Sequence, residues 1–310
     1  MTIVFKVSDK LKNKMIKYYE DKKRLKTPPY AIFQADDADT IITLYESGKV
    51  MFQGISADID ARMWKEIEKK TTGNDVDITA SENKKKKNDD RKISMDNYST
   101  IGSDEVGTGD FFGPIVVTAS YVSKDKTDFV KSLGVRDSKA LTDEKIMSIA
   151  PILIKDIPHV TFILANEEYN KHNKNGFNMN KIKAILHNKV LYEMKSKNFS
   201  YDKIVVDQFV YPKKYFEHIQ ESTKKVTDIT FLTHAEDVCA SVAVSSCISR
   251  YIFIKKMNEM SDSLHMVIPK GAGEEADKTA ARIVANFGEN KLYSVAKLNF
   301  KNTEKYKQYL

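Results

Sequence analysis

The chain has 310 residues, of which 41% are hydrophobic and 30% charged, the balance of a globular protein with room for about two domains. It contains no run of 18 or more apolar residues, and its first residues lack the order of segments seen in a signal peptide. The two cysteines, Cys239 and Cys247, are too far apart on a predicted helix for a disulfide and have no zinc-ligand partners. We therefore expect a cytoplasmic protein with both thiols in its core.

The net charge of +7 is compatible with a polyanionic partner. Residues 10–26 hold eight basic and two acidic side chains on a predicted helix, and "KKKKNDDRK" at 84–92 forms a second basic cluster. Each cluster also fits a solvated surface or a soluble linker. The charge alone therefore does not identify the binding partner.

Residues 1–70 are predicted to form a small α+β domain. The expected elements, in chain order, are a strand at 3–7, a helix at 9–26, strands within 30–35 and 40–54, and a helix at 57–70. "TLYESGKVMFQ" reads as a hairpin that turns at Ser47 and Gly48. The prediction is an antiparallel sheet with helices on one side and an open face for a partner.

Residues 71–97 are rich in charged and small side chains and are predicted to be a flexible basic linker. The large domain, 98–310, alternates strands with helices, which indicates an α/β layer structure. The strands are expected at 99–102, 114–122, 160–165 and 203–207, and the helices at 143–155, 178–195 and from 236 to about 260.

Two carboxylates stand side by side in "IGSDEVGTGDFFGP", Asp104 and Glu105. Neighbours on a regular strand point to opposite faces, so both can reach one ion only where the strand twists or ends. Gly107 and Gly109 supply that break. They also remove side chains from the loop, so that a nucleic-acid strand could approach its N–H groups.

Further carboxylates complete a candidate metal site. Asp207 ends the apolar strand "KIVVD", and the carboxyl ends of such strands form the usual ligand crevice. A fourth ligand is either Glu236 or Asp237 at the start of the long helix. An all-oxygen site favours Mg²⁺ or Mn²⁺, and two such ions about 4 Å apart can promote phosphodiester hydrolysis.

Several motifs together resemble ribonuclease HIII, and the likeness covers the whole large domain. They are "GSDEVGTGDFFGP", "DSKAL", "LHN", "IVVDQF", "AEDVCASVAVSSCISRY" and "PKGAG". The small domain is similar to the N-terminal module of that family, which resembles the TATA-binding protein. The implied architecture is α/β: a ribonuclease H-like mixed sheet flanked by helices, preceded by a small α+β domain with an antiparallel sheet.

The resemblance implies an endoribonuclease that hydrolyses the RNA strand of RNA/DNA hybrids and leaves 5′-phosphate and 3′-hydroxyl ends. By motif, the catalytic metal ligands are Asp104, Glu105, Asp207 and Glu236. Gly107, Thr108 and Gly109 would contact the ribose 2′-hydroxyls, and Lys139 a backbone phosphate. We expect Lys49 and Phe52 of the small domain to bind the hybrid as well, with neither a membrane nor an obligate protein partner.

Two other functions are considered. Ribonuclease HII shares the fold and metals but prefers isolated ribonucleotides in DNA. A hybrid-binding protein without catalysis would use the open sheet and the basic helix alone. The four carboxylates argue against it, because an acidic cluster repels a polyanion unless a metal intervenes. His187 lies between apolar neighbours and is expected to pack or to support a ligand rather than to act as a base.

Overall fold

The computed structural model describes residues 2–37, 40–54, 57–72, 79–80, 94–135 and 141–310. The chain divides into two compact units, Met1–Asp90 and Arg91–Leu310. Among the described helices, none combines the length and the apolar character needed to cross a membrane. Lys139 lies outside the described residues, as does most of the segment predicted to be a linker.

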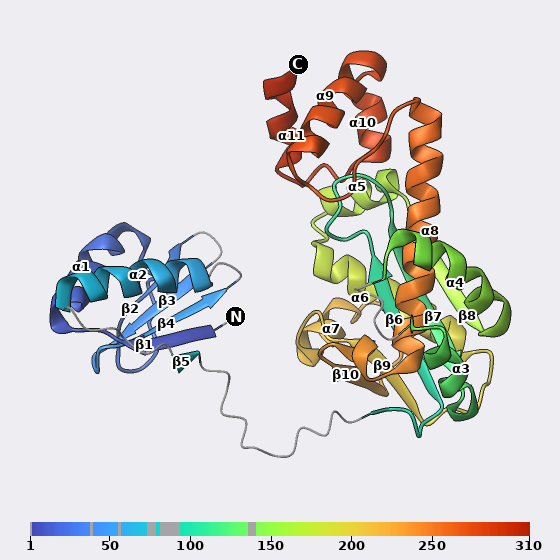
Figure 1. Ribbon diagram of the computed structural model, residues 1–310, viewed down its shortest axis with the longest axis horizontal. Coiled ribbons are helices and arrows are strands. Elements are labelled where there is room, and N and C mark those ends of the chain that lie inside the picture. The colour runs from blue at the N-terminus through green and yellow to red at the C-terminus, as the bar shows by residue number, and fades with distance from the viewer. Residues whose placement is uncertain (1, 38–39, 55–56, 73–78, 81–93, 136–140) are drawn as a thin grey trace. The chain divides into compact units, whose positions relative to one another are not determined.

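The first unit is built on a five-stranded antiparallel sheet of order β2-β3-β4-β1-β5 (Figure 1). Its elements are β1 (Thr2–Lys6), α1 (Asp9–Tyr18), the 3₁₀ turn Glu20–Lys22, β2 (Ala31–Asp37), β3 (Thr40–Tyr45), β4 (Lys49–Gly54), α2 (Ala57–Thr72) and β5 (Thr79–Ala80). The predicted hairpin joins β3 to β4 and turns at Gly48, whose φ of +80° suits glycine. The small α+β domain with an antiparallel sheet is confirmed.

Both helices pack on one face of this sheet, where alternation along the strands places the apolar side chains. Phe5, Phe33 and Phe52 point to that face and pack with Leu11 of α1 and Trp64 of α2. The indole N–H of Trp64 donates to the hydroxyl of Tyr19 at 2.8 Å. The prediction of an antiparallel sheet with its helices on one side therefore holds.

Two boundaries of the small domain differ from expectation. The helix predicted to reach residue 26 ends at Tyr18, because the chain turns to run beside β2: Lys23 pairs with Ala35, and Arg24 binds the carboxylate of Asp36. The expected domain end at residue 70 falls inside α2. β5, which pairs with β1, also lies within the segment predicted to be a linker.

The second unit contains a mixed five-stranded sheet of order β10-β9-β6-β7-β8 (Figure 1). The strands are β6 (Thr100–Val106), β7 (Ile115–Val122), β8 (His159–Leu164), β9 (Lys203–Asp207) and β10 (Ile229–Leu232). The helices are α3 (Thr127–Ser132), α4 (Asp143–Asp156), α5 (Asn166–Lys174), α6 (Met179–Lys195), α7 (Pro212–His218), α8 (Ala240–Leu264), α9 (Glu274–Phe287), α10 (Glu289–Val295) and α11 (Asn302–Lys305). β6 and β9 are parallel neighbours at the centre of the sheet.

Helices cover both faces of this sheet. Ile101, Ile204 and Val206 pack in the cluster that includes Leu186 of α6. Their strand neighbours face α8: Gly102 lies so close to Ser241 that a Cβ there would be 2.5 Å from its Oγ. The predicted mixed sheet flanked by helices is therefore confirmed.

The long helix begins later than predicted. Ala235–Asp237 form a separate 3₁₀ turn, because Cys239 between them and the helix has an extended backbone, with φ −127° and ψ 112°. α8 follows from Ala240, and both Cys239 and Cys247 are buried free thiols as expected. The far half of α8 extends beyond the sheet and packs with α9 and α10 (Figure 1).

Candidate active site at the ends of two parallel strands

The predicted carboxylates meet at one edge of the large sheet. β6 carries Asp104 and Glu105 near its carboxyl end, and Asp207 is the last residue of the parallel strand β9. Glu236 comes from the 3₁₀ turn that follows β10. All four line one cavity of about 340 Å³. The same cavity is also lined by the glycine loop 107–109, Ser246 and Arg250.

Asp104 and Glu105 point to opposite faces of β6, as regular alternation requires. Asp104 faces α8 and is hydrogen-bonded to Ser246. Glu105 faces α6, where Lys183 Nζ is 2.5 Å from Oε1 and His187 Nε2 is 2.8 Å from Oε2. β6 ends one residue later, at Val106, so both carboxylates still reach the cavity.

The pKa values of these two neighbours are shifted in opposite directions. Burial raises the pKa of Glu105, but the hydrogen bond from His187 and the charges of His187 and Lys183 outweigh it, so the pKa falls to about 2. Burial also raises the pKa of Asp104, and the charges of Glu105 and Asp207 add to the effect despite the bond from Ser246, giving about 8. The crowding at Asp104 is of the kind that a bound cation relieves.

His187 supports a carboxylate, as the sequence indicated. It is fully buried, its Nδ1 lies 2.8 Å from Ser103 Oγ, and its ring stacks on Phe209. With both nitrogens engaged, the ring fixes the orientation of Glu105.

Lys183 was not identified from the sequence. Its spacing of four residues from His187 on a helix was the available signal, since such residues share a face.

The donor set suits a hard divalent cation, because every candidate ligand atom is a carboxylate oxygen. Within the described residues, however, no group of three or more His, Cys, Asp or Glu side chains is arranged to hold a metal ion. Two carboxylates are turned to protein donors instead: Glu105 to Lys183 and His187, and Asp207 to the N–H of Ala235 at 2.9 Å. Side-chain rotation would therefore accompany metal binding.

Glu236 and Asp237, left as alternatives by the residue pattern, have different environments. Glu236 is 2% exposed and lines the cavity. Asp237, the next residue, is exposed. The geometry therefore favours Glu236 as the fourth carboxylate.

The two glycines of the loop have different constraints. Gly107 has φ +94°, and a Cβ there would lie 2.2 Å from the carbonyl oxygen of Pro114. Gly109 is exposed, and a Cβ there would meet nothing within 4 Å. The fold requires the first glycine, whereas only something outside the chain would exclude a side chain at the second.

Phe52 was wrongly predicted to contact substrate. It is fully buried and stacks on Phe5, with ring centroids 5.6 Å apart, on the helix-covered face of the small sheet. Alternation along β4 instead places Lys49, Met51 and Gln53 on the opposite face, and Lys49 is exposed. A shift of one residue along a strand exchanges a surface position for a core position.

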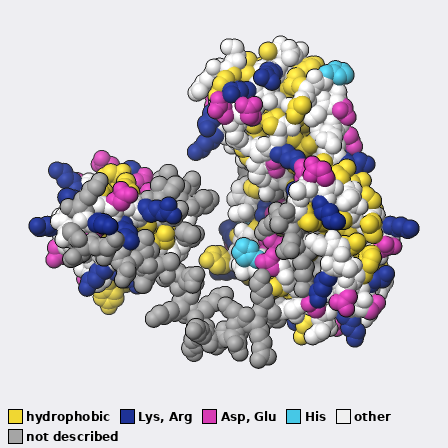
Figure 2. Space-filling model, viewed as in Figure 1, with side chains coloured by type: hydrophobic (Ala, Val, Ile, Leu, Met, Phe, Trp, Pro, Cys, Tyr) yellow, Lys and Arg dark blue, Asp and Glu magenta, His cyan; other side chains and the backbone are white. Residues whose placement is uncertain are grey.

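Basic side chains near the active-site cavity are tied to acidic ones. Arg250 donates to Asp143 Oδ1 at 2.8 Å, and Lys270 pairs with the other oxygen of the same carboxylate. On the face seen in Figure 2, Lys and Arg side chains are interspersed with Asp and Glu rather than gathered into one patch.

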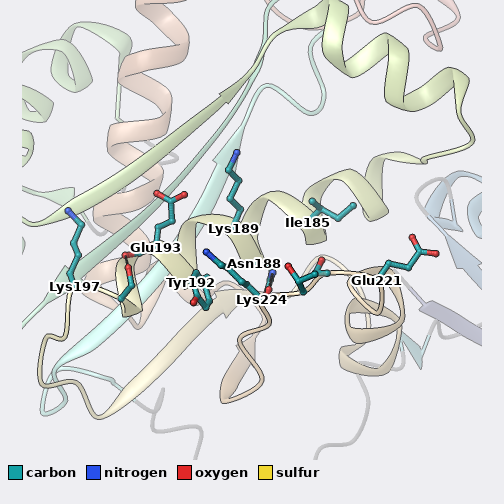
Figure 3. A pocket seen from close by; sticks show the side chains of 11 residues that line it. Ile185, Asn188, Lys189, Tyr192, Glu193, Lys197, Glu221 and Lys224 are labelled. Carbon is teal, nitrogen blue, oxygen red and sulfur yellow. Dashed lines mark hydrogen bonds between the residues drawn. The ribbon is translucent and has the colours of Figure 1, made fainter.

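A larger hollow of about 900 Å³ lies between α6 and residues 221–224. In Figure 3, Lys189, Glu193 and Lys197 project away from Lys224 rather than converging with it. This hollow is lined by none of the four carboxylates, so the candidate site is the smaller cavity at the strand ends.

A mixed sheet with carboxylates at the ends of its central parallel strands defines a ribonuclease H-like nuclease. The ribonuclease HII family matches residues 101–303, and a family described as a domain of unknown function matches residues 2–76. The chain belongs to the ribonuclease HIII family and is a ribonuclease H-type endonuclease.

Individual relatives match over nearly the whole chain. Ribonuclease HIII of Bacillus velezensis is 39% identical over 98% of this chain and 96% of its own length. Ribonuclease HIII of Bacillus cereus is 38% identical over 98% and 97%. A crystal structure of Bst-RNase HIII in complex with Mn²⁺ is 35% identical, covers 99% of this chain and 98% of its own, and superposes with a TM-score of 0.69.

Proposed function

We propose that the cavity at the ends of β6 and β9 is the active centre of an endoribonuclease acting on RNA/DNA hybrids. The observation that carries this proposal is the convergence of Asp104, Glu105, Asp207 and Glu236, from three separate segments, on one cavity beside an open glycine loop. Hydrolysis of the RNA strand would leave 5′-phosphate and 3′-hydroxyl ends.

The four carboxylates would hold Mg²⁺ or Mn²⁺, with two ions per site. The Mn²⁺ complex of Bst-RNase HIII supports a divalent ion. When bound, such ions activate a water and stabilise the charge on a leaving oxygen. The protein's own residues hold two of these carboxylates before a metal binds: Lys183 and His187 contact both oxygens of Glu105, and Ser246 bonds to Asp104.

Substrate contacts would come from the edges of the cavity. Gly107, Thr108 and Gly109 would approach the ribose 2′-hydroxyls, which distinguish RNA from DNA. Lys139 would bind a backbone phosphate. Arg250, which lines the cavity, adds a positive charge beside the path of the strand.

The first unit would be a substrate-binding domain for the same hybrid. Its open sheet face carries Lys49, which alternates along β4 with the buried side chains of the helix-covered face. Within the predicted linker 71–97, the residues that follow β5 would connect it to the catalytic domain at 98–310. Each unit has its own buried core, which supports separate binding and catalytic roles.

A cleavage assay tests the proposal. The full chain with Mg²⁺ or Mn²⁺ should cut the RNA strand of an RNA/DNA hybrid at many internal positions, and should cut a DNA duplex carrying one ribonucleotide far less. Preference for the single ribonucleotide would instead indicate the activity of ribonuclease HII. Binding of the hybrid without cleavage in either metal would indicate a non-catalytic binding protein.

A further inference from the structure

A lysine is buried completely beside the glycine loop. Lys297 has no exposed surface, and its Nζ donates to the carbonyl oxygens of Asp110 at 2.8 Å and Gly113 at 2.5 Å. Those two carbonyls bracket the turn that follows Gly109. The four proposed metal ligands do not contact this amine, and the mechanism proposed above does not use it.

The same turn is paired to the backbone of the segment that carries Lys297. Gly113 N–H donates to the carbonyl of Val295 at 3.1 Å, and Lys297 N–H donates to the carbonyl of Phe111 at 2.9 Å. Phe112 and Ala296 form an isolated antiparallel bridge between these bonds. The turn 110–113 and the segment 295–297 therefore form one short ladder, and the side chain of Lys297 crosses it.

A second C-terminal loop holds the turn from another side. Phe111 N–H donates to the carbonyl of Gly271 at 2.9 Å, and Gly271 N–H donates to Asp110 Oδ1 at 2.6 Å. Asn166 adds a further donor, with its Nδ2 2.9 Å from the oxygen of Gly113. Segments far apart in the sequence thus fix the residues just after the glycine loop.

Position of the loop depends on both of its ends. One end, Val106, is held by the ladder of β6 with β7. The other end is the turn 110–113. Gly109, between them, has open space around it. A different conformation of the turn 110–113 would therefore move the loop without unfolding the sheet.

We propose that Lys297 is a positioning residue for RNA recognition: by binding the carbonyls of Asp110 and Gly113, it sets the conformation in which Gly107–Gly109 meet the RNA strand. This inference rests on the proposed role of the glycine loop. An apolar side chain of the same length could fill the space, but the part-buried carbonyl of Asp110 would lose its amine donor and the carbonyl of Gly113 would keep Asn166 alone, which favours another turn conformation.

Burial lowers the pKa of Lys297 to about 7, and the nearby charge of Asp110 opposes the shift only in part. A neutral amine still carries two N–H donors, so both bonds can form on either side of that pH. The positioning role therefore needs the amine nitrogen rather than its charge.

The test compares Lys297→Met with wild type in the full chain. Affinity for an RNA/DNA hybrid and for a DNA/DNA duplex of the same sequence is measured with Ca²⁺ in place of Mg²⁺ to prevent turnover. The expected result is a loss of at least about fivefold in hybrid affinity with little change for DNA/DNA, since the turn 110–113 no longer holds the glycine loop in the conformation that meets RNA. Lys301→Met, at an exposed position four residues further along the chain, is the matched control and should keep wild-type selectivity.

A chemical rescue separates positioning from stability alone. Lys297→Ala leaves room for a small amine, so ethylammonium should restore hybrid selectivity in this variant and not in Lys297→Met. If both variants fail to fold, Asn166→Ala removes the other donor to Gly113 and should lower selectivity by a smaller factor.

Equal losses of affinity for both duplexes, or selectivity unchanged in a folded Lys297→Met or Asn166→Ala, would overturn the inference. Wild-type protein that itself binds both duplexes equally would refute the proposed role of the glycine loop instead.

Discussion

The two five-stranded sheets of this protein expose polar side chains in different ways. The sheet of the first unit has α1 and α2 on one face, so its other face presents alternate residues such as Lys49. The sheet of the second unit is covered on both faces, by α6 and by α8, so its polar groups gather where β6 and β9 end. A one-sided sheet offers a broad surface, whereas a two-sided sheet offers only an edge.

This difference decides how much one position matters. In β4, Phe52 belongs to the core because it alternates with Lys49 and its neighbours on the open face. In β6, Asp104 and Glu105 also alternate, yet both serve one cavity because the strand ends beside them. Function can use consecutive residues at a strand end, but only alternate residues on a face.

The largest expected effect is on cleavage, from a change at the carboxylates where β6 and β9 end. Asp207→Asn removes a ligand charge while leaving the shape of the site, so cleavage should fall by at least about a thousandfold, since a catalytic metal ion contributes several kcal/mol. Hybrid affinity in Ca²⁺ should survive. Single-turnover cleavage and filter binding measure the two. Residual turnover within about tenfold of wild type would sink the assignment.

The next comparison separates two neighbours at that edge. Glu236→Gln should reduce cleavage by at least about a hundredfold, whereas Asp237→Asn should change it by less than about threefold. The reason is that Glu236 is buried in the cavity and Asp237 is exposed. The rate of hybrid cleavage at saturating Mn²⁺ is the measurement. Equal losses would mean that the motif is misaligned here.

Removing residues 1–90 tests the open face. This cut removes β5 together with the other strands of its sheet, and all four carboxylates remain in the truncated chain. The truncated chain should fold and keep metal-dependent cleavage at high substrate concentration, but hybrid affinity should fall by about tenfold or more.

The salt dependence of that affinity gives the sharper readout. Each lost phosphate contact lowers the slope of log K against log salt by about 0.9 on B-form DNA, so the full chain should show the steeper slope. Lys49→Ala in the full chain should reproduce a small part of the change. Matching slopes for full and truncated chains would show that the first unit does not track the backbone.

The glycine loop allows a finer comparison within the edge. Gly109→Ala should leave thermal stability unchanged, because a Cβ there meets no other atom of the chain. It should weaken hybrid binding by roughly tenfold, because the Cβ would lie where the RNA strand is expected to bind. Gly107→Ala should lower stability by about 2 kcal/mol or more, because its φ of +94° and the carbonyl of Pro114 exclude a Cβ. Thermal melts and hybrid binding distinguish the two. Unaltered hybrid affinity in Gly109→Ala would place the RNA elsewhere.

Strands and helices with strong patterns could be predicted from the sequence. β9 begins and ends where the apolar run "KIVVD" does, and the hairpin turns at Gly48. The motifs also indicated Asp104, Glu105, Asp207 and Glu236, which line one cavity. The strand and the hairpin depend on local spacing and composition, whereas the choice of Glu236 over Asp237 came from the resemblance to ribonuclease HIII.

Other features depend on contacts between distant segments. The side of β4 that faces the helices could not be read from an alternating run in which Met51 and Phe52 are both apolar. Likewise, nothing local marks Lys297 as buried; that follows from its bonds to residues more than 180 positions earlier.

The last comparison concerns stability and pH in the second unit. The pKa of Lys297 is about 7 in the folded protein against an ordinary value of 10.5, so between these values the unfolded chain binds the extra proton. Lys297 should therefore add to the stability of the second unit as pH rises in this window, by at most about 1.4 kcal/mol per pH unit. Asp104, with a pKa of about 8, contributes the opposite slope up to that pH, so the difference between wild type and Lys297→Met isolates the lysine. Below pH 7 Lys297 is protonated in both states, so its contribution to the slope should vanish.

Trp64, the single tryptophan, lies in the first unit and supplies an internal control. Urea unfolding followed by far-ultraviolet circular dichroism should show the pH-dependent shift between pH 7.5 and 9.5. Fluorescence from Trp64 should show the same midpoint in wild type and Lys297→Met at each pH, because Lys297 is not in that unit. Parallel pH profiles for the second unit of both proteins would mean that Lys297 keeps its proton when buried, stabilised by Asp110 and the two carbonyls more fully than its burial opposes.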